Sequence, residues 1–157
     1  MNSFAVSTQV RPAFPYDEEG AARLLRTVFP ADPHTYERNI RESNCLNVVA
    51  ETSGGPLIGF ASLLIEASPQ RGTAEWRKYP LYIGVMAVDA LWRSKGIGTE
   101  LLQLLAAAAR QKAPHHQAMH LHVDCDSPAV RFYERFGFSK VSEFKGSYLM
   151  RLVFGPR

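Results

Sequence analysis

The chain has 157 residues, of which 46% are hydrophobic and 21% charged, a composition typical of one globular domain rather than a disordered or fibrous protein. We therefore expect a single domain over residues 1–157. The formal net charge is only +3 and no run of five Lys or Arg residues occurs, which argues against a nucleic-acid-binding protein. No apolar stretch approaches the roughly 20 residues that span a bilayer, and no signal-peptide pattern opens the chain, so we expect a cytoplasmic protein without a membrane partner.

In the first half of the chain, periodicity and turn residues predict strands and two helices. The predicted elements are a strand at 6–13, helices at 18–29 and 33–41, and strands at 46–52 and 57–65. Asp17 offers an N-cap for the first helix, and Asp32 followed by Pro33 starts the second. The Ser-Gly-Gly-Pro turn between the two later strands predicts a hairpin. Residues 67–80 are predicted to form a long polar loop.

In the second half, strands and helices alternate. The predicted elements are a strand at 81–88, a helix ending at Lys112, a strand at 119–124, a helix from Pro128 to Gly137, and strands at 138–144 and 147–154. The run at 81–88 is continuously apolar, so we expect this strand to be buried on both faces. Mixed strands and helices on one chain predict an α/β fold built around one sheet.

A glycine pair separates the apolar strand at 81–88 from the long helix that follows it. Gly96 and Gly98 allow backbone conformations and close ligand approach that other residues do not. The first amides of a helix have no internal acceptor and carry the positive end of its dipole, so they bind phosphate. Arg93 and Lys95 place cationic donors beside them. The segment therefore predicts a phosphate-binding turn.

Two other interpretations of this turn stay open. Glycines before a helix are common as plain structural turns. A general nucleotide-binding protein is a further alternative, although the spacing matches neither the Walker motif nor the complete GxGxxG fingerprint, because Glu100 and Leu101 follow.

Several motifs in order along the chain resemble those of the GNAT superfamily of acetyltransferases. Arg93-x-x-Gly96-x-Gly98 resembles the family's pyrophosphate loop, and residues 126–138 resemble its N-x-x-A-x-x-x-Y-x-x-x-G-F block. Residues 148–152 resemble its final strand. The resemblance implies the GNAT fold, a mixed and mostly antiparallel sheet that is splayed at its centre, with helices on both faces. It also implies an N-acetyltransferase with acetyl-CoA as co-substrate and no metal.

The resemblance implies a set of cofactor-binding residues. They are Met86, Ala87, Val88, Arg93, Ser94, Lys95, Gly96, Ile97, Gly98, Thr99 and Asp126. The strand amides would hydrogen-bond the pantetheine and polarise the thioester carbonyl, and the loop amides would hold the diphosphate. Asp126 departs from the family's usual Asn, because its carboxylate accepts hydrogen bonds but does not donate them. Ser127 is an alternative for that contact.

Three residues are candidates for proton transfer. Tyr133 matches the family tyrosine that faces the CoA sulfur, so we predict that it is the general acid; the alternative is a core tyrosine. Tyr82 and His122 are candidates for the base. We expect only one of His120 and His122 to face the site, and either ring is equally well explained as structural.

A narrower resemblance concerns the amine substrate. Phe29-Pro30 is similar to a pair that lines the pocket for the first residue in protein Nα-acetyltransferases of the stand-alone, methionine-preferring type. In that group, tyrosine and histidine residues matching Tyr82 and His122 hold a catalytic water, and a tyrosine matching Tyr148 contacts the peptide. The spacing from His122 to Asp126 is one residue short, which makes His120 the alternative. Alternatively, Phe29 and Pro30 simply end the first helix, with Phe29 as a buried aromatic side chain.

The sequence leaves several functions open. The amine is either a protein or peptide N-terminus or a small molecule such as a polyamine, amino acid, aminoglycoside or xenobiotic. A non-catalytic acyl-CoA-binding sensor with the same fold is a further alternative. We expect a monomer or a homodimer.

Overall fold

The computed structural model describes residues 6–42, 44–66 and 79–156. Its elements are β1 (Thr8–Pro12), η1 (Pro15–Asp17), α1 (Glu18–Val28), α2 (Pro33–Arg41), β2 (Cys45–Thr52), β3 (Leu57–Ile65), β4 (Leu81–Val88), η3 (Ala90–Trp92), α3 (Ile97–Lys112), β5 (Ala118–Asp124), α4 (Ala129–Phe136), β6 (Ser139–Phe144) and β7 (Ser147–Val153). The order is the predicted one, and element ends differ by one or two residues. Most of the predicted loop at 67–80 lies outside the described residues. None of the helices in the described ranges combines the length and apolar character that a membrane crossing requires.

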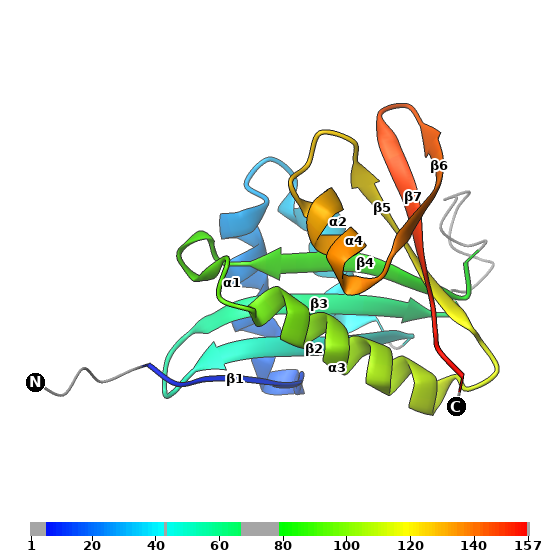
Figure 1. The fold of residues 1–157 in the computed structure, drawn as a ribbon. Coiled ribbons are helices and arrows are strands. Elements are labelled where there is room, and N and C mark those ends of the chain that lie inside the picture. Colours follow the sequence, from blue (N-terminus) through cyan, green and yellow to red (C-terminus); the bar gives the residue numbers. More distant parts are fainter. Residues whose placement is uncertain (1–5, 43, 67–78, 157) are drawn as a thin grey trace, which may run out of the picture.

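The strands form one seven-stranded sheet in the order β1-β2-β3-β4-β5-β7-β6. Neighbouring strands are antiparallel, except that β4 and β5 run parallel and share a single register pair, Tyr82 with His120. Strands β1 to β4 lie side by side in Figure 1, whereas β5, β7 and β6 are turned away from them. The prediction of a mixed, mostly antiparallel sheet splayed at its centre is confirmed. We call the opening between β4 and β5 the seam.

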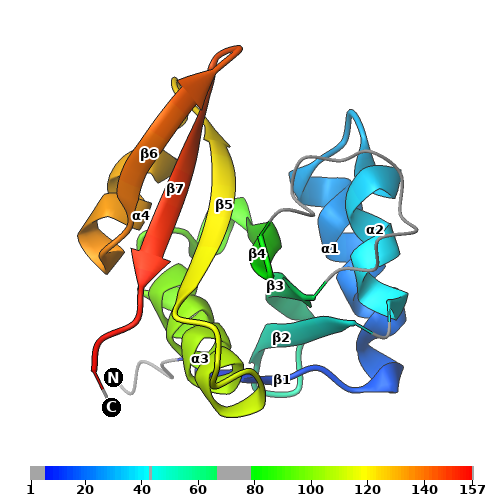
Figure 2. The same cartoon turned by 90° about the vertical axis from the view of Figure 1, so that its right-hand side faces the viewer.

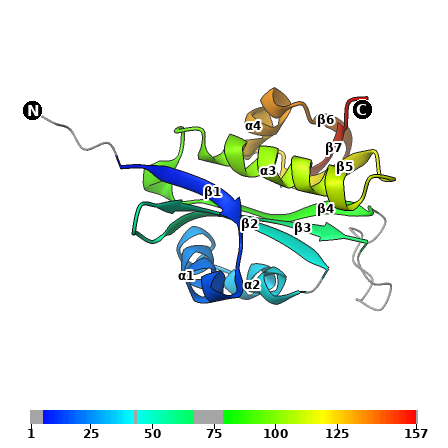
Figure 3. The ribbon, with the colours of Figure 1, turned by 90° about the horizontal axis from the view of Figure 1, so that it is seen from below.

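The helices cover both faces of the sheet. Helices α1 and α2 lie on one face and α3 and α4 on the other (Figure 3). Figure 2 shows the same arrangement from the side, with β5 to β7 and α4 on one side of the seam and α1 and α2 on the other. The apolar core is divided accordingly: Leu101 and Met119 belong to the cluster under α3, while Leu25 and Phe60 belong to the cluster under α1.

Strand β4 is not buried on both faces as predicted. Its odd-numbered residues are buried, whereas Tyr82, Gly84, Met86 and Val88 are partly exposed. The apolar run alone is compatible with full burial. The exposure arises because β5 diverges from β4 beyond Tyr82 and leaves that part of the strand uncovered.

A β-bulge interrupts β4 at Gly84. Ser62 pairs with Val85 and Leu63 pairs with Ile83, so Gly84 is the extra residue. Ile83 consequently packs in the α3-side cluster, whereas Val85 packs in the α1-side cluster. The sequence analysis did not predict the bulge, although a glycine inside an otherwise apolar strand is its usual signal.

An ion-pair cluster anchors α1 to the sheet edge. Arg11 in β1 donates two hydrogen bonds to the Asp17 carboxylate, at 2.8 and 2.9 Å, and its Nε donates to Glu51 in β2 at 2.9 Å. The Asp17 side chain is buried, and its carboxylate also accepts the Phe14 N–H. The hydrogen bonds from Arg11 hold the pKa of Asp17 below its ordinary value.

Candidate functional site

Tyr82 and His122 meet across the seam. The Tyr82 hydroxyl lies 2.7 Å from His122 Nδ1, and the two rings are 5.6 Å apart between centroids. Leu81, Ile83 and Leu121 point into the α3-side cluster, so Tyr82 and His122 lie on the face that carries α1 and α2. When Nδ1 of the neutral imidazole carries no proton, the tyrosine hydroxyl donates to it.

His120 lies on the same face as His122, contrary to our expectation that only one ring would face the site. Residues two apart in a strand point to the same side. The contacts nevertheless distinguish them, because His122 bonds the Tyr82 hydroxyl whereas His120 stacks on Tyr79 at 4.5 Å. Burial, with smaller effects from Arg151 and His122, lowers the pKa of His120 and keeps it neutral.

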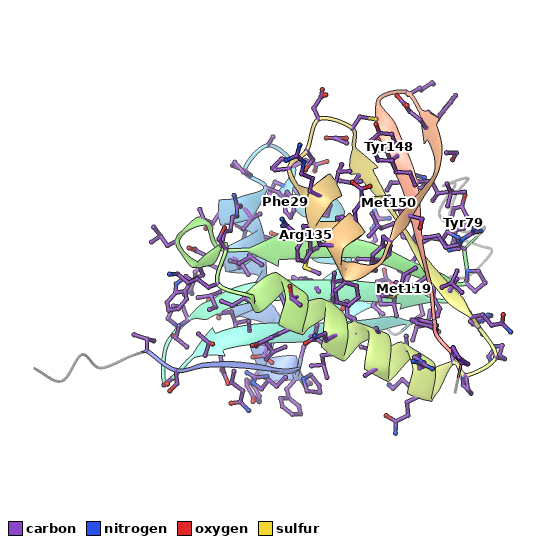
Figure 4. The ribbon with its side chains drawn as sticks, viewed as in Figure 1. Phe29, Tyr79, Met119, Arg135, Tyr148 and Met150 are labelled. Atoms are coloured by element: carbon purple, nitrogen blue, oxygen red, sulfur yellow. The ribbon has the colours of Figure 1, made fainter. Side chains whose placement is uncertain are left out.

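Tyr79 joins this cluster, and the sequence analysis missed it. Its ring lies edge-on to His122, at 6.2 Å, and 6.3 Å from Tyr82. Figure 4 labels Tyr79 beside the start of β4. Tyr79 falls in the predicted loop, where no periodicity marks individual positions; its proximity to Tyr82 in sequence was the only signal.

Tyr133 approaches the seam from the opposite face. It is buried on α4, with its ring packed between Phe132 and Phe138 at 5.2 and 5.5 Å. Burial raises the pKa of Tyr133 far above its ordinary value, so its hydroxyl stays protonated at neutral pH. Among the described residues no hydrogen-bond partner of that hydroxyl is found. A group held in the seam would thus have Tyr82 and His122 on one face and a proton donor on the other.

The second half of β4 presents a free backbone edge towards the seam. Residues 86–88 pair with β3 on one side, but no described strand pairs with their β5-facing edge. The Val88 carbonyl accepts a hydrogen bond from Arg93 Nε at 3.1 Å. This edge is the predicted site for an extended ligand that continues the sheet's hydrogen bonding.

The predicted phosphate turn has the backbone of an anion site. Ser94 and Gly96 have positive φ angles of 62° and 85°, and Gly96 is the N-cap of α3. The first helical bond runs from Glu100 N–H to Gly96 O, so the N–H groups of residues 97–99 have no helical acceptor. The stretch from Arg93 to Gly96 is exposed, and Gly98 and Thr99 are partly exposed, so the Lys95 side chain lies at the surface beside the start of α3.

Gly98 and Ser127 have clear structural roles beside this turn. A Cβ on Gly98 would lie 3.1 Å from the Phe132 ring, so its small size lets α4 pack against the start of α3. The Ser127 hydroxyl accepts the Ala129 N–H at 3.1 Å and so caps α4. Asp126 is exposed just before it, and its predicted cofactor contact stays a prediction.

The residues predicted to bind the amine substrate separate into two groups. Phe29 stacks on Tyr36 at 4.2 Å and packs on the cluster that contains Val85 of β4, so it lies on the face of the Tyr82–His122 pair. Pro30 follows it and is exposed.

Tyr148 belongs to the other group. It packs on the α3-side cluster, on the opposite face, with Lys140 Nζ 4.5 Å from its ring centroid. Figure 4 labels it on the final hairpin. The structure therefore does not bring Tyr148 to the pair.

A separate cavity of about 210 Å³ opens between η1, α1, the end of α2 and β2. Phe14, Asp17, Cys45 and Phe60 are among its lining residues, and none of the candidate site residues lines it. We therefore place the chemistry at the seam and not in this cavity.

Comparison with known proteins agrees with this geometry. The model of the family described as "Acetyltransferase (GNAT) family" matches residues 13–138. No curated protein matches the sequence.

Solved structures with a similar fold include PaiA N-acetyltransferase from Thermoplasma acidophilum in complex with coenzyme A (17% identity, 94% of this chain and 99% of that chain, TM-score 0.74). Arabidopsis thaliana NAA60 with a bisubstrate analogue is 23% identical (94% and 98%, TM-score 0.72). An aminoglycoside 6'-N-acetyltransferase complexed with coenzyme A is 17% identical (95% and 98%, TM-score 0.72). At these identities the likeness concerns the fold alone.

Proposed function

Since the chain belongs to the GNAT family of acetyltransferases and is an N-acetyltransferase, we propose that it transfers the acetyl group of acetyl-CoA to the N-terminal α-amine of a peptide or protein. One observation carries the proposal: the Tyr82 hydroxyl and His122 Nδ1 lie 2.7 Å apart on the face that also carries Phe29. A proton-accepting pair and an apolar side chain thus lie on the same face of the sheet.

The cofactor would lie along the seam. The diphosphate would bind the N–H groups of residues 97–99 with Arg93 and Lys95, and the pantetheine would continue along the free edge of residues 86–88. The unpaired strand edge and the uncapped helix start support this placement. Coenzyme A in complexes of proteins with the same fold also supports it.

The reaction requires one bond to form, one bond to break and protons to move at both the amine and the thiolate. The neutral amine attacks the thioester carbonyl, a C–N bond forms and the C–S bond breaks. The amine proton passes, directly or through one water, to the Tyr82 oxygen as Tyr82 gives its own proton to His122 Nδ1. The leaving thiolate takes the proton of the Tyr133 hydroxyl, which burial keeps protonated at neutral pH. His122 is then an imidazolium and Tyr133 a tyrosinate, and one proton carried by water from the first to the second restores both groups.

Amine basicity favours a peptide N-terminus. At pH 7.5, neutralising an α-amine with a pKa near 8 costs under about 1 kcal/mol, whereas neutralising a lysine-like amine with a pKa near 10.4 costs about 4 kcal/mol. Phe29 and Tyr36 form an apolar surface on the same face, which would pack against an apolar first side chain.

Thiol release from acetyl-CoA tests the proposal on a panel of amines. The panel contains peptides beginning with Met, Ala and Ser, the same peptides with blocked N-termini, and polyamine, lysine and aminoglycoside substrates. We expect the highest kcat/KM on a free peptide N-terminus and none on the blocked peptide. Faster turnover of a small amine would replace the proposed substrate, and coenzyme A binding without turnover of any amine would indicate a sensor.

A further inference from the structure

A second group of titratable side chains lies outside the candidate active site. Glu66, directly after β3, accepts hydrogen bonds at Oε1 from His115 Nε2 at 2.9 Å and from His116 Nε2 at 2.8 Å. The two histidines belong to the loop between α3 and β5, about 50 residues further along the chain. No step of the proposed acetyl transfer uses these three residues.

The donor atoms of these residues already converge. One atom from each of Glu66, His115 and His116 lies within 4.8 Å of the others. Ligands at about 2.0–2.1 Å from a tetrahedral Zn²⁺ are separated by about 3.3 Å, so the distances from Glu66 Oε1 to the two Nε2 atoms, 2.9 and 2.8 Å, would need to open by only about half an ångström. His116 is 21% exposed, and His115 and Glu66 are more than half exposed, so an ion has access and one coordination position remains for water.

We propose that Glu66, His115 and His116 bind a divalent transition-metal ion, with Zn²⁺ as the best match. Two imidazole nitrogens and one carboxylate oxygen are a ligand set that Zn²⁺ prefers, whereas Mg²⁺ and Ca²⁺ favour oxygen ligands. In the structure each Nε2 donates its hydrogen to Glu66. On metal binding each neutral ring keeps its single proton on Nδ1 instead, and the Nε2 lone pair becomes the ligand.

The proposed ion would join the two parts of the sheet, which are β1 to β4 on one side of the seam and β5 to β7 on the other. Glu66 N–H donates to Pro80 O at 2.7 Å, and Pro80 lies two residues before Tyr82. His116 lies four residues before His120, the register partner of Tyr82. The ion would therefore lie near the end of the seam where Tyr82 pairs with His120, and it would link the end of β3 with the start of β5. The resemblance to the GNAT superfamily implied no metal, and Glu66 lies too far from the two histidines in the chain for their spacing to indicate one.

Calorimetric titration of the tag-free full chain with ZnCl₂, after removal of metal with a chelator, tests the proposal. We expect one ion per chain with a Kd on the order of 10 µM or tighter, since three ligands bind more weakly than a four-ligand structural site. The substitutions Glu66→Gln and His116→Ala should each weaken binding by at least about tenfold.

His34→Ala is the matched control, because His34 is also exposed and lies 3.8 Å from a single carboxylate, that of Glu37, without a second histidine. It should leave the affinity unchanged. Thermal melting with and without ZnCl₂ gives a second readout, and the melting temperature should rise for the unmodified chain and the His34 variant only.

Absence of stoichiometric uptake by the unmodified chain at about 100 µM ZnCl₂ would overturn the proposal and leave the group as a hydrogen-bonded link. Equal uptake by the Glu66 and His116 variants would overturn it as well. Melting of each variant without metal confirms that it is folded, so neither outcome depends on the variants failing to fold.

Discussion

The seam divides the sheet into a first part, β1 to β4, and a second part, β5 to β7. Long runs of backbone pairing join the strands within each part, whereas very little backbone pairing joins one part to the other. Within the first part, β3 and β4 pair from Gly59 with Val88 to Ile65 with Leu81. Within the second, β5 and β7 pair from Ala118 with Val153 to Asp124 with Ser147. Between the parts, Tyr82 and His120 are the only register partners among the residues that the structure describes.

This difference shows how a sheet provides a binding site. Paired strands use their N–H and C=O groups on each other, so they have none left for a ligand. At the seam, β4 leaves one edge unpaired beyond Tyr82, and side-chain contacts add to the backbone pairing of Tyr82 with His120: Tyr82 bonds His122, and Glu66 bonds two histidines. We therefore expect changes across the seam to alter activity or ligand binding, and changes within one part to alter stability.

The largest effect is expected from breaking the Tyr82–His122 link. His122→Ala and Tyr82→Phe should each lower kcat about 100- to 1000-fold on the best amine, because the proton-accepting pair is lost. The double variant should be little worse than either single variant, since the two groups act as one unit. Steady-state kinetics measures this, with His34→Ala as control. Full activity in either single variant would remove the pair from the mechanism.

Tyr133→Phe is expected to have the next largest effect. It removes the proposed acid but keeps the packed ring, so kcat should fall about 10- to 100-fold while coenzyme A affinity stays nearly unchanged. Thiol-release kinetics and calorimetry measure the two quantities separately. Tyr16→Phe, at an exposed tyrosine outside the seam, is the control. An unchanged kcat would assign Tyr133 to the core alone.

Gly84→Ala tests the bulge within the first part of the sheet. An added Cβ would lie 2.5 Å from Asn39 Nδ2 and 2.8 Å from Leu64 Cδ1, so overpacking should lower the free energy of unfolding by about 2 to 3 kcal/mol. Chemical denaturation measures the change. Gly155→Ala is the matched control, because a Cβ there meets no atom within 4 Å. Equal stability of the two variants would mean that Asn39 and Leu64 move aside freely.

Asp17→Asn should have a smaller effect, on stability alone. It weakens the buried pair with Arg11 and should cost about 1 to 2 kcal/mol of unfolding free energy without lowering kcat. Glu19→Gln, whose exposed i,i+4 pair with Arg23 contributes little, is the control on the same helix.

The pH dependence of the same variant gives the smallest expected signal. The pKa of Asp17 is lower in the folded chain than in the unfolded chain, so its stabilisation is present above the unfolded value, about 4, and is lost as the pH falls through the folded value. The stability difference between the unmodified chain and Asp17→Asn should therefore shrink below about pH 4. A constant difference would contradict the lowered pKa.

Local patterns determined most of the secondary structure. The strands at 46–52 and 57–65 and the helices before Phe29 and Gly137 follow from periodicity, caps and turns, which act within a few residues. The spacing of Arg93, Gly96 and Gly98 likewise located the turn before α3, because the left-handed backbone at Gly96 favours glycine.

Only the tertiary structure decided how distant residues meet. The sequence could not choose between His120 and His122, because both lie on one face of β5 and it is the placement of β4 beside β5 that puts His122, and not its register partner His120, at the Tyr82 hydroxyl. Nor could it place Tyr148 on the opposite face from that pair, or bring Glu66 to His115 and His116. These contacts depend on strand register and on the splay of the sheet, which arise from packing between segments that are far apart in the chain.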